Sequence, residues 1–267
     1  MIKMTHYWLL CVLVLSGCAT HTSPTGRSQT LLFSATEINQ MGNQSFEQIK
    51  QQTKMSKDPA INRYVSCISD RITRLLPDKT LQWDVVVFES PQVNAFALPG
   101  GHIGVYTGLL KVAENEAQLA TVIGHEVAHV LANHSNEQVS RSQMTGVGMQ
   151  LADVALGVGG VGNKDLYMAA LGLGTQVGFI LPYGREQESE ADMMGVELMA
   201  RAGFDPSQSM VLWQNMAKQS GGQGPELLST HPSDDHRIAD LSKMQVQVAP
   251  LYKASKAKIK QACKIDK

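Results

Sequence analysis

The stretch TVIGHEVAHVLANHS, residues 121–135, holds three histidines and one glutamate within ten positions. The first two histidines, His125 and His129, bracket Glu126 in the pattern His-Glu-x-x-His. On a helix that turns about 100° per residue, His125 and His129 lie about 40° apart, so both imidazoles can bind one metal ion. A catalytic zinc ion takes three protein ligands and keeps a fourth position open. The stretch therefore leaves the third ligand to be found.

His134 does not supply that ligand on a continuous helix, because it lies about 180° from His125. In metzincins a glycine turns the chain, and a third histidine follows six residues after the second. Here Ala132 stands at the glycine position and Ser135 at the histidine position. We therefore interpret His134 as a residue at the C-terminal end of the helix, stabilised by the helix dipole. The opposite face is apolar and predicts a contact with the core: Leu119, Ile123, Val127 and Val130.

An acidic segment, REQESEADMMG at residues 185–195, offers the missing ligand. Glu188 and Asp192 share one face of a helix, whereas Glu190 lies on the other side. We assign Glu188 to zinc, and Asp192 to a hydrogen bond that fixes the ring of a ligand histidine. The alternative is that these acids form a solvated face; the His-Glu-x-x-His motif in the same chain favours the ligand assignment.

Three further residues have chemical roles in this interpretation. Zinc lowers the pKa of a bound water molecule to about 7. A carboxylate beside this water can take its proton and pass the proton to a leaving amine, and we assign this role to Glu126. His231, at a loop-to-helix boundary, could donate a hydrogen bond to the developing oxyanion. Arg237 could hold a neighbouring carboxylate or contact substrate. The alternative for this pair is a helix cap and a surface arginine.

The N-terminus indicates export. Lys3 precedes a short apolar run at 7–15, and the ending Leu-Ser-Gly-Cys at 15–18 resembles a bacterial lipobox. We expect a signal peptide at 1–17, lipidation of Cys18, a polar tether over 18–34 and, from Ala19 after the cysteine, sorting to the outer membrane. The alternatives are an ordinary signal peptide or a buried helix.

Composition narrows the function classes. The chain has 267 residues, 43% of them hydrophobic and 18% charged, which suits an ordinary globular core. A formal net charge of −1 argues against a nucleic-acid partner. After export and lipidation two cysteines remain, Cys67 and Cys263, and they either pair in an oxidising compartment or stay as separate thiols.

Hydrophobic patterning predicts mainly helices, with a strand at 83–88 and a hairpin turning at Pro99-Gly100-Gly101. The glycine-rich segment 144–181 is either a pair of helices packed over the site, which we favour, or a membrane-dipping hairpin. The basic tail at 251–267 is a solvated end or a contact with anionic lipid. The expected helices cover about 35–55, 59–76, 115–135, 184–202, 205–219 and 231–245.

Three motifs resemble peptidase family M48, which includes the CAAX prenyl proteases and the heat-shock protease HtpX. They are HEVAH at 125–129, ESEAD at 188–192 and HPSDDHR at 231–237, in family order, and the resemblance spans about 60–245. It is closest to the short bacterial lipoprotein members. The resemblance implies an α+β, mainly helical, zincin-like (gluzincin) domain with a small sheet, which we place at 35–250. It also implies one zinc ion on His125, His129 and Glu188, with Glu126 as the base.

The resemblance further supports His231 and Arg237 as substrate or transition-state contacts. It places Asn94, Ala95 and Phe96 on an edge strand, where a substrate chain could add as another strand. Such binding tolerates many side chains and suits unfolded proteins. The segment between the two metal helices lacks the clear spans of the membrane-embedded members, which argues against processing of prenylated peptides.

Together these features predict a zinc endopeptidase that is lipid-anchored to the bacterial outer membrane, faces the periplasm and degrades misfolded or unassembled envelope proteins. Candidate partners are those substrates, the membrane and the outer-membrane assembly machinery. The alternative is a zinc-bound chaperone or assembly factor with latent proteolysis.

Overall fold

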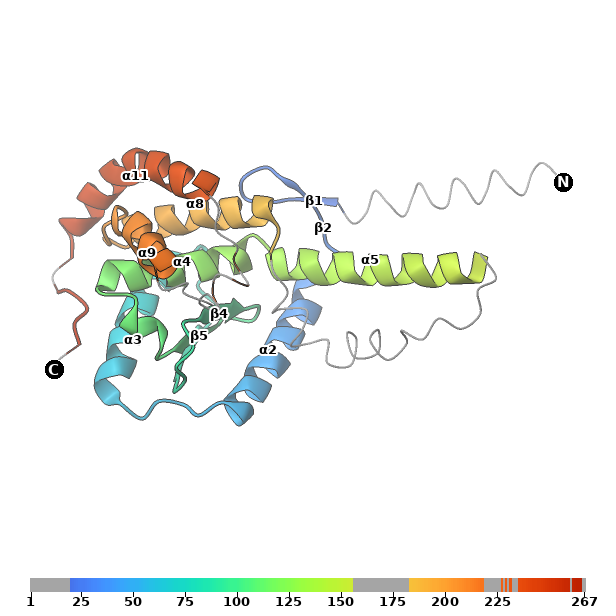
Figure 1. Ribbon diagram of the computed structural model, residues 1–267, viewed down its shortest axis with the longest axis horizontal. Helices are drawn as coiled ribbons and strands as arrows, with labels where there is room; N and C mark the ends of the chain where they lie inside the picture. The colour runs from blue at the N-terminus through green and yellow to red at the C-terminus, as the bar shows by residue number, and fades with distance from the viewer. Residues whose placement is uncertain are drawn as a thin grey trace.

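The computed structural model describes residues 20–155, 183–218, 227, 229, 231, 235–259 and 261–265. The signal segment, Cys18 and residues 156–182 lie outside this part. The expected mainly helical α+β fold with a small sheet is confirmed (Figure 1). The elements are β1 (Thr20–Thr22), β2 (Ser28–Thr30), α2 (Ala35–Gln52), α3 (Pro59–Thr73), β3 (Asp84–Phe88), β4 (Ala95–Leu98), β5 (His102–Tyr106), η1 (Leu109–Lys111), α4 (Glu116–Leu131), α5 (His134–Ala155), α8 (Arg185–Arg201), α9 (Gln208–Lys218) and α11 (Asp235–Lys256).

Helices α2, α3 and α4 begin where a side chain accepts free N–H groups of the first turn. The Ser34 side chain accepts from the Glu37 N–H at the start of α2, and Asp58 precedes Pro59 at the start of α3. Asn115 accepts from the N–H groups of Ala117 and Gln118 and so starts α4. These local signals explain why the predicted starts of these three helices agree with the structure.

A three-stranded sheet has the order β3-β5-β4, with β3 parallel and β4 antiparallel to β5. The predicted hairpin is confirmed: Gly100 and Gly101 turn the chain with φ values of +93° and +87°, which glycine adopts without strain. Because β4 pairs with β5 alone in the described sheet, β4 is an edge strand there, as expected for Ala95 and Phe96.

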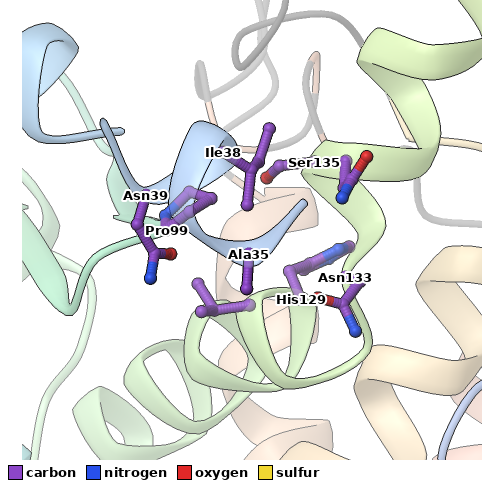
Figure 2. Close-up of a pocket in the computed structure, with 9 residues that line it drawn as sticks. Ala35, Ile38, Asn39, Pro99, His129, Asn133 and Ser135 are labelled. Atoms are coloured by element: carbon purple, nitrogen blue, oxygen red, sulfur yellow. The ribbon is translucent and has the colours of Figure 1, made fainter. Parts of the chain in front are cut away.

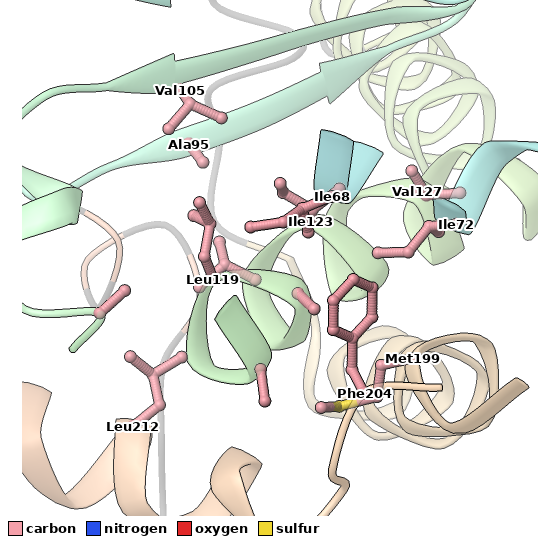
Figure 3. Packing of buried hydrophobic residues seen from close by; sticks show 14 of the residues in the cluster. Ile68, Ile72, Ala95, Val105, Leu119, Ile123, Val127, Met199, Phe204 and Leu212 are labelled. Atoms are coloured by element: carbon pink, nitrogen blue, oxygen red, sulfur yellow. The ribbon is translucent and has the colours of Figure 1, made fainter. Parts of the chain in front are cut away.

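Helix α4 is the centre of the core. Every residue from Ala117 to His129 is buried, because the helix lies between the sheet and α3 on one side and α8 on the other (Figure 1). Its apolar face packs against Ile68 and Ile72 of α3, while Met199 and Phe204 approach from the α8 side (Figure 3). The predicted core residues of this face, Leu119, Ile123 and Val127, are fully buried, and Val130 is partly buried.

The backbones of α4 and α8 come unusually close at a pair of glycines. A Cβ built on Gly124 would lie 2.9 Å from the carbonyl oxygen of Gly195, and one built on Gly195 would lie 2.8 Å from the backbone nitrogen of His125. Any side chain at either position would meet backbone, which cannot move aside easily. The two glycines therefore set the distance between the helix that carries His125 and the helix that carries Glu188.

Both ends of the described part of the chain are attached to this core. Residues 20–30, expected in a tether, instead form an antiparallel hairpin of β1 and β2. A disulfide joins Cys67 of α3 to Cys263, so part of the tail at 251–267 is held to α3, and α11 reaches Lys256 rather than ending near 245. The Cys263 N–H donates to Glu116 at the start of α4, 2.6 Å away.

The segment at 144–181 is described only up to Ala155, where it continues α5. In the described part of the chain, no helix is both long and apolar enough to cross a membrane. The two interpretations of this segment, a helix pair and a membrane-dipping hairpin, remain predictions.

We expect Gly195→Ala to destabilise the protein. Overpacking against the His125 backbone costs about 1–3 kcal/mol, which outweighs the roughly 1 kcal/mol that alanine gains in a helix. Gly184→Ser is the control, since it adds a Cβ at the N-cap of the same helix, where the nearest atom is Gln187 Oε1 at 3.7 Å. Urea denaturation gives the free energy of unfolding of both variants. Equal free energies of unfolding would contradict the packing argument.

Candidate metal centre

Four buried side chains from three parts of the chain converge on one point. His125 and His129 lie one turn apart on α4, Glu188 lies in the first turn of α8, and His231 precedes α11. One ligand atom from each lies within 4.8 Å of the others. The two histidines and the glutamate assigned from the sequence are therefore brought together, and His231 joins them.

The distances within this cluster fit a zinc ion. His125 Nε2 lies 3.0 Å from His129 Nε2, 3.2 Å from His231 Nδ1 and 3.4 Å from Glu188 Oε2. Tetrahedral zinc with bonds of about 2.0–2.1 Å separates neighbouring donor atoms by roughly 3.3 Å. Imidazole and carboxylate are also the donor types that zinc prefers, so the residues present fit the ion.

A second layer of charged groups holds the ligands. Asp192 Oδ1 lies 3.0 Å from His125 Nδ1, in the place predicted for it. Arg237 donates from Nε and Nη2 to the two oxygens of Asp192, at 2.7 and 2.9 Å. Its Nη1 lies 2.8 Å from Glu188 Oε2. Of the two roles considered for Arg237, the structure shows the one in which it holds carboxylates. It is buried against Trp213 and does not line an open surface.

Burial and neighbouring charges shift the carboxyl pKa values in opposite directions. Burial raises the pKa of Glu188, but the imidazoles of His231 and His125 outweigh it and hold that pKa well below its usual range. Asp192 behaves in the same way, with His125 and Arg237 lowering its pKa against burial. Both groups are therefore anions, as a metal ligand and the partner of a ligand must be.

Glu126 differs from Glu188 and Asp192, because the effect of burial on its pKa is larger than the opposing effect of its neighbours. Its side chain is 3% exposed, and burial raises its pKa although His231 and His125 oppose the shift. Glu126 Oε1 lies 3.3 Å from His231 Nε2, and the backbone of Ala97 in β4 also acts against the rise of the Glu126 pKa. Glu126 thus lies between the metal cluster and the edge strand, and its pKa is raised above the ordinary value of a glutamate.

His134 has a different position from the one predicted. Helix α4 ends at Leu131, and Asn133 turns the chain with φ +55°, a left-handed conformation that asparagine tolerates better than most residues. His134 is therefore the first residue of α5 and not the last of α4. Its Nδ1 lies 2.8 Å from Nδ1 of His129, so it contacts the outer nitrogen of a ligand histidine. The prediction failed because asparagine, and not glycine, makes the turn.

Two aromatic residues at the site carried no signal in the sequence. Tyr183 stacks on His129 with ring centroids 4.0 Å apart, and its hydroxyl lies 3.2 Å from Ser135 Oγ. The rings of Trp213 in α9 and His125 pack in a T-shaped arrangement, with their centroids 6.1 Å apart. Neither belongs to a spaced motif, and only the packing of distant segments places them against the ligands.

The edge-strand residues Ala95 and Phe96 make their described contacts within the sheet and its aromatic group. Ala95 is buried and pairs with Val105, and Phe96 packs in an aromatic group with Phe88 and Tyr106. A pocket of about 60 Å³ lies beyond the end of β4 with His129 on its wall (Figure 2); this volume is large enough for a few water molecules. Its lining is Ala35, Ile38, Asn39, Pro99, His129, Val130, Asn133, Ser135 and Asn136.

Comparison with known families identifies the domain. Residues 58–245, which include all four converging side chains, match the family model of peptidase family M48. The chain belongs to peptidase family M48. The predicted family is therefore confirmed, and the four buried side chains of the M48 domain form a group that could hold a metal ion.

Several curated relatives share the M48 domain. The chain is 35% identical over 182 residues to the mitochondrial metalloendopeptidase OMA1 of Schizosaccharomyces pombe, covering 67% of this chain and 52% of that protein. It is 34% identical over 238 residues to metalloendopeptidase OMA1 of Danio rerio, covering 82% and 49%. It is 28% identical over 221 residues to the beta-barrel assembly-enhancing protease of Escherichia coli K12, covering 79% and 44%. The chain spans about half the length of these relatives.

We expect wild-type protein to bind one zinc ion per chain and Glu188→Gln to bind it at least tenfold more weakly, because an amide oxygen is a poorer zinc ligand than a carboxylate. Glu186→Gln is the matched control, since Glu186 is exposed in the same turn of α8. Competition with a chelator of known affinity measures the zinc affinity of the wild type and of both variants. Equal affinities of the two variants would remove Glu188 from the metal site.

Proposed function

We propose that the chain is a zinc-dependent endopeptidase. The observation that carries this proposal is the buried convergence of His125, His129 and Glu188 with the carboxylate of Glu126 beside them, in a domain of family M48. A zinc ion bound there would polarise a peptide carbonyl and lower the pKa of a water molecule to about 7. The names of the relatives, metalloendopeptidase and protease, support the same reaction class.

Glu126 is the group that we assign to proton transfer. Burial raises its pKa, which suits a general base, because such a base works best when its pKa approaches the operating pH. The carboxylate accepts a proton from the attacking water as the water oxygen bonds to the carbonyl carbon. The same carboxyl then donates the proton to the amide nitrogen as the carbon–nitrogen bond breaks.

The other charged groups have positioning roles. Asp192 holds the ring of His125, and Arg237 holds both Asp192 and Glu188, so that the ligand geometry is set before substrate arrives. We do not assign substrate contact to Arg237, because its guanidinium is occupied by these carboxylates. His231, whose Nε2 lies near Glu126, is the remaining candidate donor to the oxyanion.

An extended substrate chain would bind along β4. This edge strand lies against α4, and the backbone of Ala97 contacts Glu126. Backbone pairing with β4 would carry a peptide bond past the base with little demand on side chains. Such binding favours unfolded segments, because a folded protein does not offer a free strand.

We assign the protein to envelope quality control. The lipobox-like ending at Cys18 points to a lipid anchor at the periplasmic face of the outer membrane, and misfolded envelope proteins would be its substrates. One relative is named for beta-barrel assembly, which supports the outer-membrane assembly machinery as a partner to test.

One observation favours a second candidate, a zinc-bound chaperone with latent proteolysis. His231 Nδ1 lies in the donor group, 2.9 Å from Glu188 Oε1, and a fourth protein ligand would close the position that catalysis needs. In that state the protein would bind zinc and unfolded chains without cleaving them.

Glu126→Gln should retain zinc yet lower cleavage of casein or another unfolded substrate by about 10²–10⁴-fold, because the base is lost and the ligands remain. Glu114→Gln, an exposed glutamate just before α4, is the control and should cleave normally. Undiminished cleavage by Glu126→Gln would refute the mechanism. Full rescue of a deletion strain by this variant would favour the chaperone.

Cys18→Ala should release the protein from the membrane fraction, because the lipid attachment site is lost while the export segment remains. Fractionation and labelling with radioactive palmitate measure the change. Incorporation of palmitate into Cys18→Ala would contradict the assignment of the anchor.

A further inference from the structure

Ion pairs between one partly buried arginine and two buried glutamates hold the N-terminal hairpin to the metal domain. Arg27, between β1 and β2, points its guanidinium at two carboxylates: Nη1 and Nη2 donate to Glu137 at 2.8 and 2.7 Å, and Nε donates to Glu190 at 2.9 Å. Thr25 Oγ1 donates to the other oxygen of Glu190 at 2.6 Å. Glu137 belongs to α5 and Glu190 to α8, so the hairpin lies at the junction of these helices (Figure 1).

The same network reaches the metal cluster through one histidine. Glu190 Oε2 lies 3.1 Å from His134 Nε2, and His134 Nδ1 lies 2.8 Å from His129 Nδ1. Because His129 Nε2 belongs to the donor cluster, its Nδ1 carries the proton and donates to His134 Nδ1. The proton of His134 is then on Nε2 and donates to Glu190. From His129 to Glu190 each hydrogen bond donates outward from the ligand, and the Glu190 carboxylate also accepts from Arg27 Nε.

We propose that Arg27 is a positioning residue for the metal centre, acting through Glu190 and His134 on the ring of His129. The guanidinium sets the place of the Glu190 carboxylate, which orients His134, and His134 in turn holds the tautomer and ring angle in which His129 Nε2 faces the metal. Asp192 serves His125 in the same way. The two ligand imidazoles therefore have separate supports, one on α8 and one that begins in the N-terminal hairpin.

This arrangement links the metal centre to the end of the chain that carries the proposed anchor. Arg27 is nine residues after Cys18, in the segment expected to be a tether. The hairpin is held by more than Arg27, since Gln29 Nε2 donates to the Ala132 carbonyl at 2.6 Å and the Leu32 N–H donates to Ser140. Removing the Arg27 side chain thus tests the network while other contacts keep the hairpin in place.

The experiment measures the zinc affinity of the full chain, extracted in detergent, by competition with a chelator of known affinity. We expect Arg27→Ala to weaken zinc binding roughly tenfold, in the range found when the partner of a metal ligand is lost. Arg141→Ala is the matched control: Arg141 also pairs with Glu137, at 3.2 Å, but its side chain is 68% exposed and contacts neither Glu190 nor His134 in the described structure. This control should keep wild-type affinity.

A double-mutant cycle separates positioning from simple anchoring of the hairpin. If Arg27 acts through His134, Arg27→Ala should change affinity by less than about twofold in a His134→Ala background, because the connection is already broken. A full tenfold loss in that background would overturn the proposal, as would wild-type affinity of Arg27→Ala alone. The absorption spectrum of cobalt(II) bound in place of zinc gives a second readout, which should change in Arg27→Ala and not in Arg141→Ala.

Two further points keep the test decisive. If Arg27→Ala does not fold, Thr25→Val, which removes one hydrogen bond to Glu190, replaces it in the same cycle. We expect a smaller loss of zinc affinity for Thr25→Val than for Arg27→Ala. Wild-type zinc affinity of Thr25→Val would contradict the proposal. The inference rests on the proposed metal ligands and not on proteolysis. A wild-type chain without zinc binding would refute the proposed function, whereas normal binding by wild type and by Arg27→Ala would refute this inference alone.

Discussion

The close approach of α4 and α8 at Gly124 and Gly195 is the constraint on which the metal centre depends. Each helix carries half of the site: α4 presents two imidazoles, and α8 presents two carboxylates four residues apart. With side chains at the crossing, the helices would separate, and the donor atoms of His125 and Glu188, now 3.4 Å apart, could no longer share one ion. The apolar packing of α4 against α3 and the sheet then holds this crossing in the middle of the core.

Burying so many charged groups would be costly if they were unpaired. The structure offsets the cost by giving each ligand side chain a partner on its outer side. Asp192 and Arg237 support His125 and Glu188, while His134 and Glu190 support His129. Among the carboxyl groups named here, Glu126 alone has a raised pKa, and the contrast with Glu188 assigns different chemistry to two buried glutamates.

Both ends of the described chain return to the same core. The N-terminal hairpin inserts Arg27 between α5 and α8, and the Cys67–Cys263 disulfide holds the C-terminal segment to α3, near the start of α4. These two attachments hold the N-terminal hairpin and the C-terminal segment in defined places relative to the candidate metal ligands.

The sequence by itself determined whatever depends on local spacing and local propensity. The starts of α2, α3 and α4, the glycine turn between β4 and β5, the apolar face of α4, and the pairing of His125 with His129 and of Glu188 with Asp192 all follow from helix periodicity or turn chemistry. Only the tertiary structure decided the position of His134, the stacking of Tyr183, the approach of His231 and the network of Arg27. Those contacts join residues from about 40 to more than 160 positions apart or depend on a single left-handed asparagine, and no periodic signal encodes which distant surfaces meet when the core closes.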